Sequence, residues 1–176
     1  MVRVGEEMAT VFRAHGLQVI HDTNLYDYPA YNGAYERSLA AVEDWLAEYP
    51  TIQVVLDVHR DAIQREDGTR VKPVVEIDGQ KAAQVMIICG ADLNGNLPNF
   101  KQNLRFASRW QDQMETLYPG LARPVLFDYR YYNQDLTTGS LLIEMGGHGN
   151  TLQEAIYSAR LVGKALAALF TAEAGQ

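Results

Sequence analysis

The stretch VVLDVHRDAI, residues 54–63, joins a strand pattern to a cluster of titratable side chains. The apolar, β-branched run IQVVLDV at 52–58 predicts a strand buried on both faces of a parallel sheet. Strands usually end on turn residues, but this one ends on His59, which is flanked by two aspartates and an arginine. In an open α/β sheet, functional groups gather outside the carboxyl ends of the strands. The stretch therefore indicates either a structural histidine or one corner of a functional site.

Helix and strand patterns alternate along the rest of the chain. Apolar periodicity predicts helices at 4–15, 35–49, 100–117 and 151–170, the last opening with a Thr151 and Glu154 capping box. Further strands are predicted at 17–22, 123–134 and 140–146, and a hairpin is predicted from 73–77, a turn at Asp78-Gly79, and 84–90.

This alternation predicts an α/β fold, with a mostly parallel sheet flanked by helices and one inserted β-hairpin. The chain is expected to form a single domain over residues 1–176. The pattern opens on a helix, whereas such sheets commonly open on a strand. We therefore expect the first strand to be missing from this chain.

Composition excludes several classes of function. The net charge of −7, without a basic stripe, argues against a nucleic-acid partner. No run reaches the roughly 20 apolar residues of a membrane span, and two adjacent glutamates near the N-terminus argue against a signal peptide. Cys89 is the single cysteine, so no internal disulfide forms, and it is interpreted as a small core residue.

Two predicted strand ends carry groups that can act together in chemistry. His59 ends one strand, and Glu144 lies at the end of LLIE in another. A neutral imidazole is a good zinc ligand, and a nearby carboxylate can take a proton from water, which suggests metal-assisted hydrolysis. Two simpler interpretations stay open: His59 is a structural histidine, and Glu144 forms a salt bridge with an arginine.

The remaining polar residues near these ends each have two interpretations. Arg60 and Asp61 lie at the same rim as His59, where they either grip a polar substrate or form a surface ion pair. Asn150 precedes the capping box and finishes the turn, while His148 lies in the loop GGHGN close to Glu144. A group of tyrosines either stacks on sugar or peptide or packs over the sheet edge: Tyr26, Tyr28, Tyr31 and Tyr35.

Long stretches of the chain resemble one protein family. They are HDTNLYDYPAYNGAYERSLAAVEDWLAEYPTIQVVLDVHRDAI (21–63), KPVVEIDGQKAAQVMIICGAD (72–92), YPGLARPVLFDYRYYNQDLTTG (118–139) and GSLLIEMGGHGNTLQEA (139–155). These stretches are similar to the stage II sporulation protein P family, cell-wall hydrolases of endospore-forming bacteria. The resemblance covers essentially the whole chain.

The resemblance implies a branch of the zinc-dependent N-acetylmuramoyl-L-alanine amidases. By that matching, His59 is a Zn²⁺ ligand and Glu144 is the catalytic carboxylate, with Gly146 and Asn150 framing its loop; Arg37 matches the arginine at a helix start. We assign Arg60, Asp61 and Asn150 to substrate binding. The implied reaction is cleavage of the amide between muramic acid and L-alanine in peptidoglycan, with a further endopeptidase activity.

The resemblance also implies what this chain lacks. The family places its first zinc ligands, a histidine and an acidic residue, before the first helix, so only His59 is identified here, and His21 is a conceivable substitute. We therefore expect an amidase domain that is incomplete at its N-terminus. His148 stands where we expect a small or polar residue.

The resemblance further implies partners and a location. Its members act at the sporulation septum during engulfment, outside the cytoplasmic membrane, through a membrane anchor absent from this chain, and with a lytic transglycosylase of the sporulation complex. The alternative is a non-catalytic peptidoglycan-binding or scaffolding module on the same fold.

Overall fold

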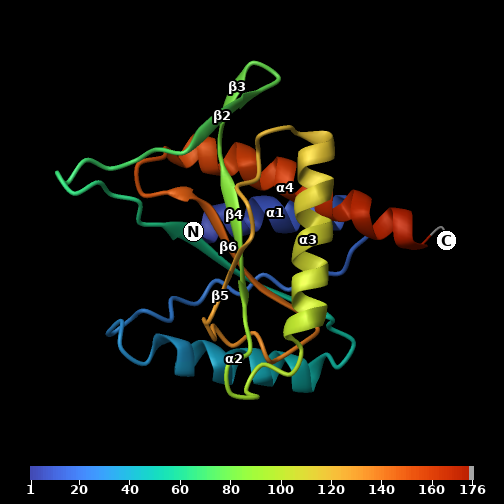
Figure 1. Cartoon of the computed structure of the whole chain (residues 1–176). Coiled ribbons are helices and arrows are strands. Elements are labelled where there is room, and N and C mark those ends of the chain that lie inside the picture. Colours follow the sequence, from blue (N-terminus) through green and yellow to red (C-terminus); the bar gives the residue numbers. More distant parts are fainter. Residues whose placement is uncertain (175–176) are drawn as a thin grey trace.

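The computed structural model describes residues 1–174 as helices packed on a four-stranded sheet, with a separate two-stranded hairpin (Figure 1). The elements in chain order are α1 (Val2–Ala14), α2 (Ala34–Glu48), β1 (Val54–Asp61), β2 (Val74–Ile77), β3 (Gln80–Ala83), β4 (Val85–Gly90), α3 (Phe100–Leu117), β5 (Leu126–Asp128), β6 (Gly139–Gly147) and α4 (Leu152–Ala174).

The main sheet has the order β1-β6-β4-β5. β6 pairs in parallel with β1 and antiparallel with β4, and β4 pairs in parallel with β5. This arrangement confirms the predicted α/β fold with a mostly parallel sheet. β6 is one of the two interior strands, and every one of its residues is buried except Glu144, which is half-buried.

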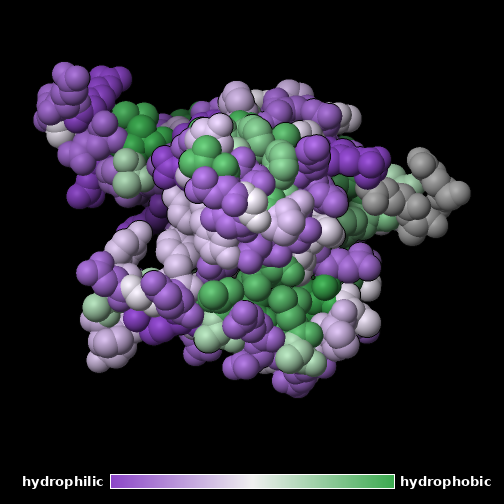
Figure 2. Space-filling model, turned by 60° about the horizontal axis from the view of Figure 1, so that its bottom comes forward, coloured by the Kyte–Doolittle hydropathy of each residue, from purple (hydrophilic) through white to green (hydrophobic). Residues whose placement is uncertain are grey.

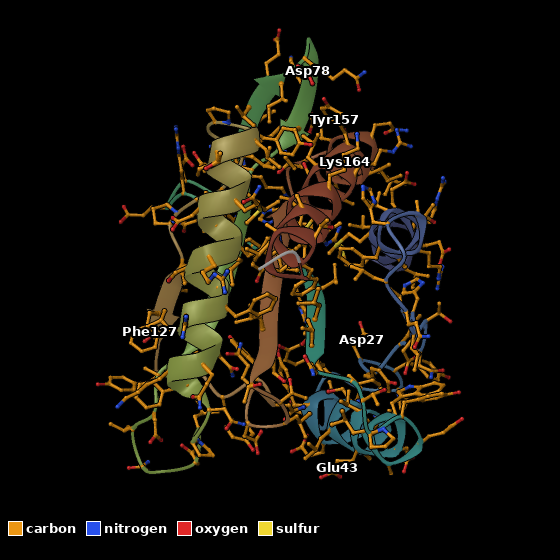
Figure 3. All side chains as sticks on the ribbon, turned by 90° about the vertical axis from the view of Figure 1, so that its right-hand side faces the viewer. Asp27, Glu43, Asp78, Phe127, Tyr157 and Lys164 are labelled. Atoms are coloured by element: carbon orange, nitrogen blue, oxygen red, sulfur yellow. The ribbon has the colours of Figure 1, made fainter. Side chains whose placement is uncertain are left out.

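Three helices form one continuous layer on the sheet. Figure 3 shows α3, α4 and α1 side by side, with α2 apart from them at the bottom, where Glu43 is labelled. The core between this layer and the sheet includes Trp110 of α3, Ile143 of β6 and Leu166 of α4, all at most 2% exposed. Gly163 of α4 lets α1 approach closely, because a Cβ there would lie 3.1 Å from Val11.

The predicted capping box opens α4. The Thr151 N–H donates to Glu154 Oε2 at 2.9 Å, and the Glu154 N–H donates to Thr151 Oγ1 at 3.2 Å. Residues Leu152–Ala172 are apolar and long enough to cross a membrane by length and composition, but 56% of the window is buried inside the protein. α4 is therefore a core helix of this domain.

α2 is much less well packed than the other helices. It forms where the periodicity predicts a helix, yet none of its residues is buried. Its apolar side chains, among them Val42, Trp45 and Leu46, are half-buried. Figure 2, a view that brings the underside of Figure 1 forward, shows a patch of hydrophobic residues on this side of the molecule.

Two strand predictions are wrong for the same reason. Residues 17–22 form no strand, and β1 is half-buried along its length rather than buried on both faces. Within the part of the chain that the structure describes, β1 pairs only with β6 and is an edge of the sheet. No described strand pairs with the segment 17–22, so its β pattern is not part of a hydrogen-bonded ladder in residues 1–174.

The inserted hairpin is confirmed, with a corrected partner. β2 pairs with β3 across the turn at Asp78 and Gly79, both of which have positive φ angles of 50° and 74°. The run QVMIICG, predicted as the second arm, instead supplies β4 to the main sheet. The predicted strand over 123–134 is also shorter, since only Leu126–Asp128 pairs.

Shortening a buried side chain of β6 should destabilise the domain strongly. Ile143→Ala removes buried methyl and methylene groups from a fully buried site and is expected to lower the free energy of unfolding by about 2–5 kcal/mol. Urea denaturation measures the change. Leu93→Ala, at a position 64% exposed, is the matched control and should change it by less than about 0.5 kcal/mol. Equal effects of the two substitutions would contradict this placement of the core.

Candidate functional site

The pairing of β1 with β6 places His59 beside Glu144. The two residues are partners in the parallel register, although 85 positions separate them along the chain. Both lie near the carboxyl ends of their strands, where the register then shifts between His59 and Asp61. The predicted convergence of the imidazole and the carboxylate on one sheet edge is therefore present in the backbone.

Asp57 fixes the imidazole from within the same strand. It lies two residues before His59, so both side chains project from the same face of β1. Asp57 Oδ1 lies 2.9 Å from His59 Nε2. This hydrogen bond raises the pKa of His59 above its ordinary value against the opposing effect of burial, with a further contribution from the charges on Asp57 and Glu144. Nε2 is thus oriented by a carboxylate, which leaves Nδ1 for another ligand.

Glu144 is held in an environment that disfavours its charge. Burial is the main cause, and the negative charge on Asp61 adds to it, so that the pKa of Glu144 is raised to about 7 despite the positive charges of His59 and Arg123. Its Oε2 is buried and has no hydrogen-bond partner. A carboxylate in this state is suited to accept a proton near neutral pH.

Asp61 and Arg60 take different positions at the rim. Asp61 Oδ2 accepts a hydrogen bond from Arg123 Nη2 at 2.9 Å, in a half-buried ion pair. Its Oδ1 accepts from the Ala62 N–H. Arg60 is exposed at the register shift. Asp61 therefore helps to position the strand end, and the predicted contact of either residue with substrate stays a prediction.

Hydrogen bonds of Asn150 hold the loop that follows Glu144 in place. Its Oδ1 accepts a hydrogen bond from the Gly147 N–H at 2.8 Å, and its Nδ2 donates to the Pro73 carbonyl at 2.9 Å and to Glu154 Oε2 at 3.1 Å. Gly146 has a φ of +76°, and a Cβ there would lie 2.6 Å from Ala83 and 2.7 Å from Asn150 Oδ1. Asn150 thus frames the loop, as the sequence resemblance implies. Its predicted contact with substrate is untested.

A pair of tyrosine rings lies close to Asp57 and Glu144. The rings of Tyr35, at the start of α2, and Tyr132 are 5.3 Å apart. Burial and then the charge on Asp57 raise the pKa of Tyr35, with a smaller contribution from Glu144. Asn133 Nδ2 donates to the Tyr35 carbonyl at 2.9 Å and so ties this helix start to the loop after β5. Tyr28 and Tyr31, by contrast, are more than three-quarters exposed.

The other histidines have local partners. His21 Nδ1 lies 2.8 Å from Glu6 Oε2 of α1, and His15 Nδ1 lies 2.8 Å from the Val11 carbonyl. The His148 N–H donates to the Asp61 carbonyl at 2.8 Å, while its Nδ1 is buried without a partner. His21 thus has a structural role in holding residues 17–22 against α1.

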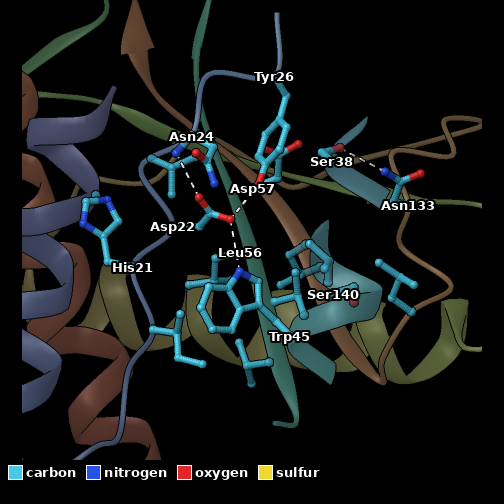
Figure 4. A pocket seen from close by; sticks show the side chains of 18 of the residues that line it. His21, Asp22, Asn24, Tyr26, Ser38, Trp45, Leu56, Asp57, Asn133 and Ser140 are labelled. Carbon is cyan, nitrogen blue, oxygen red and sulfur yellow. Dashed lines mark hydrogen bonds between the residues drawn. The ribbon is translucent and has the colours of Figure 1, made fainter. Parts of the chain in front are cut away.

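Polar contacts also attach α2 to the segment before it. Asp22 accepts hydrogen bonds from Tyr26 Oη, the Trp45 indole N–H and the Asn24 N–H, at 2.5, 3.1 and 2.8 Å (Figure 4). Figure 4 shows this network on one wall of a cavity whose opposite wall is β1, with Leu56 and Asp57 labelled. Arg37 of α2 donates to the Tyr26 and Ala30 carbonyls and closes the intervening loop.

The donor set fits part of a zinc site. His59 offers one imidazole nitrogen with an orienting carboxylate behind it, and Glu144 offers a buried oxygen without a partner. A catalytic zinc commonly has three protein ligands. Among residues 1–174, no group of three or more His, Cys, Asp or Glu side chains is arranged to hold a metal ion. Among the described residues, the site therefore offers one imidazole and one carboxylate, which are fewer groups than the three ligands of a catalytic zinc.

Sequence comparison places the chain in a family. A family model described as stage II sporulation protein P matches residues 1–167. The stage II sporulation protein P of Bacillus subtilis (strain 168) is 36% identical over 129 residues, which are 70% of this chain and 30% of that protein. The chain belongs to the stage II sporulation protein P family. It spans about 30% of the length of this curated relative.

Solved structures similar to this member of the family are amidases. The N-acetylmuramoyl-L-alanine amidase AmiC2 of Nostoc punctiforme matches 99% of this chain and 82% of its own, with a TM-score of 0.55. The N-acetylmuramyl-L-alanine amidase Ami1 of Mycobacterium smegmatis matches 97% and 74%, with a TM-score of 0.59. Identity is 12% in both cases, so these similarities show a shared fold. The predicted zinc amidase-like fold is confirmed.

Half-buried Glu144 and buried Glu154 should respond to pH in opposite ways. A raised pKa means that the folded state binds the Glu144 proton more tightly, so stability falls as pH rises from the ordinary glutamate range through about 7. With a chelator present, Glu144→Gln should therefore stabilise the protein at pH 8, by on the order of 1–2 kcal/mol after discounting for partial solvent access, and should have little effect near pH 4.

Glu154→Gln is the matched comparison. Burial works against the charge of Glu154, but hydrogen bonds from Lys72, the Thr151 N–H and Asn150 outweigh it and lower the pKa. This substitution should destabilise at pH 8, by about 1–2 kcal/mol, with a smaller effect as pH falls through the lowered pKa. Urea denaturation from pH 4 to 8 measures both. Destabilisation by Glu144→Gln at pH 8 would contradict the electrostatics described for the site.

Proposed function

We propose that this chain is the catalytic domain, over residues 1–176, of a peptidoglycan hydrolase that cleaves the N-acetylmuramoyl-L-alanine amide during endospore engulfment. The observation that carries the proposal is the register of β1 with β6, which sets His59 beside the half-buried Glu144. Family membership and the amidase fold support it. A further endopeptidase activity on the stem peptide is part of the same proposal.

Glu144 is the general base in this proposal. Hydrolysis of an amide requires that a proton be taken from the attacking water and given to the leaving nitrogen. The unpartnered Glu144 Oε2 accepts the first proton, and a pKa raised to about 7 by burial allows the same carboxyl group to donate it later. The negative charge of Asp61 keeps that proton affinity high.

His59 is a Zn²⁺ ligand, with Asp57 as the residue that positions it. When bound, zinc supplies polarisation of the scissile carbonyl and activation of a water molecule at neutral pH. Asp57 holds Nε2 of the imidazole at 2.9 Å, so that Nδ1 carries the lone pair offered to the metal. The other ligands come from outside residues 1–174.

Residues around the carboxyl ends of β1 and β6 supply the substrate contacts in this proposal. Arg60 is exposed for polar groups of the peptide, Asp61 and Asn150 hold the strand end and loop against the substrate, and the Tyr35–Tyr132 pair stacks on sugar or peptide. The whole protein acts outside the cytoplasmic membrane, at the sporulation septum, through a membrane anchor beyond this chain. Its partner is a lytic transglycosylase of the sporulation complex.

A second candidate function is a non-catalytic peptidoglycan-binding or scaffolding module. The observation that favours it is that residues 1–174 hold no group of three metal-ligating side chains. Such a module would retain contacts of the rim with peptidoglycan but release no stem peptide. Binding to isolated sacculi without hydrolysis, by a chain extended with its native upstream sequence and supplied with zinc, would favour this module.

Hydrolysis should depend on Glu144 and on sequence beyond this chain. Residues 1–176 alone are expected to release few or no stem peptides from isolated sacculi. The upstream-extended chain with zinc should release them, and Glu144→Gln should lower the rate at least 10²-fold, because the proton acceptor is lost. Mass spectrometry of the soluble products identifies the bond. Zinc retention by the variant is the control, and unchanged release would remove Glu144 from its role.

Asp57 should affect metal affinity more than folding. Asp57→Asn in the upstream-extended chain is expected to weaken zinc binding about 10–100-fold, because the imidazole loses its orienting carboxylate. Competition with a fluorescent chelator measures the affinity. Asp67→Asn is the matched control, since Asp67 lies in an exposed loop, where its hydrogen bonds are local and include one from the Thr69 N–H. Equal zinc affinities of the two variants would contradict the positioning role.

A further inference from the structure

Three tyrosine side chains gather beside the candidate site. The rings of Tyr35 and Tyr132 are 5.3 Å apart, and Tyr31 and Tyr132 both contribute to the raised pKa of Tyr35. Tyr31 is 76% exposed, whereas Tyr35 and Tyr132 are half-buried. We call these three residues the tyrosine cluster.

The tyrosine cluster lies toward the amino-terminal end of β1. Tyr132 lines the same cavity as Asp57, and this cavity is lined by residues 54–58 of β1, which precede His59. Asp57 comes two residues before His59, and Asp61 comes two residues after it. At about 3.3 Å per residue, the two aspartates are roughly 13 Å apart along the strand. The tyrosine cluster and the carboxyl end of β1 therefore lie on opposite sides of His59.

The backbone holds Tyr132 in a strained conformation. Tyr132 and Asn133 have positive φ angles of 44° and 52°, a region that residues other than glycine seldom adopt. Asn133 Nδ2 holds the turn by donating to the Tyr35 carbonyl at 2.9 Å and to Ser38 Oγ at 3.2 Å. Buried Gln134 then bonds twice to the backbone of β4. Strained residues cluster at sites that bind ligands, and here the strain sets the Tyr132 ring against Tyr35.

Tyr31 is presented by a loop that Arg37 closes. Arg37 donates to the carbonyls of Ala30 and Asn32, which lie on either side of Tyr31. The Tyr31 carbonyl accepts from the Ala34 N–H at 3.1 Å. An exposed aromatic ring on a fixed backbone offers a large contact area at a low cost in conformational entropy. The tyrosine cluster is therefore preorganised to contact a ligand.

The charges around the tyrosine cluster favour a ligand without charge. Arg130 donates to Asp128 Oδ2 at 3.0 Å and to Tyr132 Oη at 2.9 Å, so a carboxylate already balances its charge. Asp27 and Glu36, on the loop and at the start of α2, are exposed and would repel an anion. An uncharged sugar ring suits this surface, because its C–H face stacks on an aromatic ring while its hydroxyl and acetamido groups bond to neighbouring polar groups.

We propose that the tyrosine cluster binds the N-acetylated glycan strand of peptidoglycan, with sugar rings stacked on Tyr31 and Tyr132. The identity of this polymer rests on the proposed function. The sugar, rather than the stem peptide, is the partner of the tyrosine rings.

The position of the tyrosine cluster also orients the substrate. The glycan lies on the side of Asp57, and the scissile amide lies at the pair formed by His59 and Glu144. The stem peptide then extends past the carboxyl end of β1, where Arg60 is exposed. The reactive pair thus separates a sugar side from a peptide side.

Binding of an uncharged sugar oligomer tests the tyrosine cluster without zinc and without hydrolysis. The probe is chitohexaose, the hexamer of N-acetylglucosamine, which has no peptide and no carboxylate. It is titrated into residues 1–176 in the presence of a chelator, and NMR shifts give the Kd. Wild-type protein should bind it, and Tyr31→Ala should raise the Kd at least about fivefold, because one stacked ring is lost. Failure of the wild-type protein to bind chitohexaose would overturn the proposal.

Tyr49→Ala is the matched control. Tyr49 is 43% exposed and follows α2 at its other end, about 20 Å from Tyr35 along the helix axis. Its substitution should leave the Kd for chitohexaose unchanged. An equal loss of binding in Tyr31→Ala and Tyr49→Ala would overturn the placement of the sugar on the tyrosine cluster.

Tyr132 separates stacking from hydrogen bonding. Tyr132→Phe keeps the ring but loses the hydroxyl that accepts from Arg130, and it should change the Kd by less than about twofold. Tyr132→Leu removes the aromatic face and should raise the Kd at least about fivefold. Equal losses in the two variants would overturn stacking as the mode of binding.

Arg60→Ala tests the orientation of the substrate. Arg60 lies on the peptide side, so this substitution should leave the Kd for chitohexaose unchanged. A loss of sugar binding as large as that of Tyr31→Ala would overturn the assignment of the two sides.

Failure of this proposal is distinguishable from failure of the proposed function. Binding of chitohexaose through the tyrosine cluster, by a chain that releases no stem peptide when extended and supplied with zinc, would support the glycan site and count against hydrolysis. Release of stem peptides by a protein that does not bind chitohexaose would overturn the glycan site alone.

Discussion

The parallel backbone ladder between β1 and β6 is the interaction on which the site depends. Among residues 1–174 it is the only strand pairing of β1, and it joins residues that are far apart along the chain. A slip of one residue in this register would turn His59 to the other side of the sheet from Glu144. Burial of β6 on both faces prevents that slip, because its side chains are committed to the core. The geometry of the site is therefore set by the core.

The two sides of the sheet are stabilised in different ways. α1, α3 and α4 bury apolar side chains against β4 and β6, and this side contains the whole buried core cluster. α2 and the segment before it are held largely by polar contacts, centred on Asp22 and Arg37. Hydrogen bonds of partly exposed groups contribute little net free energy. The side with α2 should therefore open at a lower free energy than the rest of the domain.

The local pattern of apolar and polar residues was sufficient to predict most helices and strands, and to predict that His59 lies beside Glu144. The helices followed from their periodicity, and Asp78-Gly79 correctly marked the hairpin turn. Two predictions were wrong: the strand at 17–22 and the burial of β1 on both faces. Both depend on which strands lie alongside, and a strand pattern in the sequence does not reveal whether a partner strand is present. Asp57 was detectable by its spacing of two from His59. Arg123 was not, because its contact with Asp61 spans 62 residues and leaves no local signal.

The hydrogen bond from Asn150 to Glu154 couples the start of α4 to the turn after β6. The carboxylate that opens α4 also accepts from the side chain that closes the turn behind Glu144. The first turn of α4 and the turn that follows β6 are thus held by the same carboxylate. Fraying of that helix start would loosen the turn, so a substitution in the first turn of α4 would also change the surroundings of Glu144 at the end of β6.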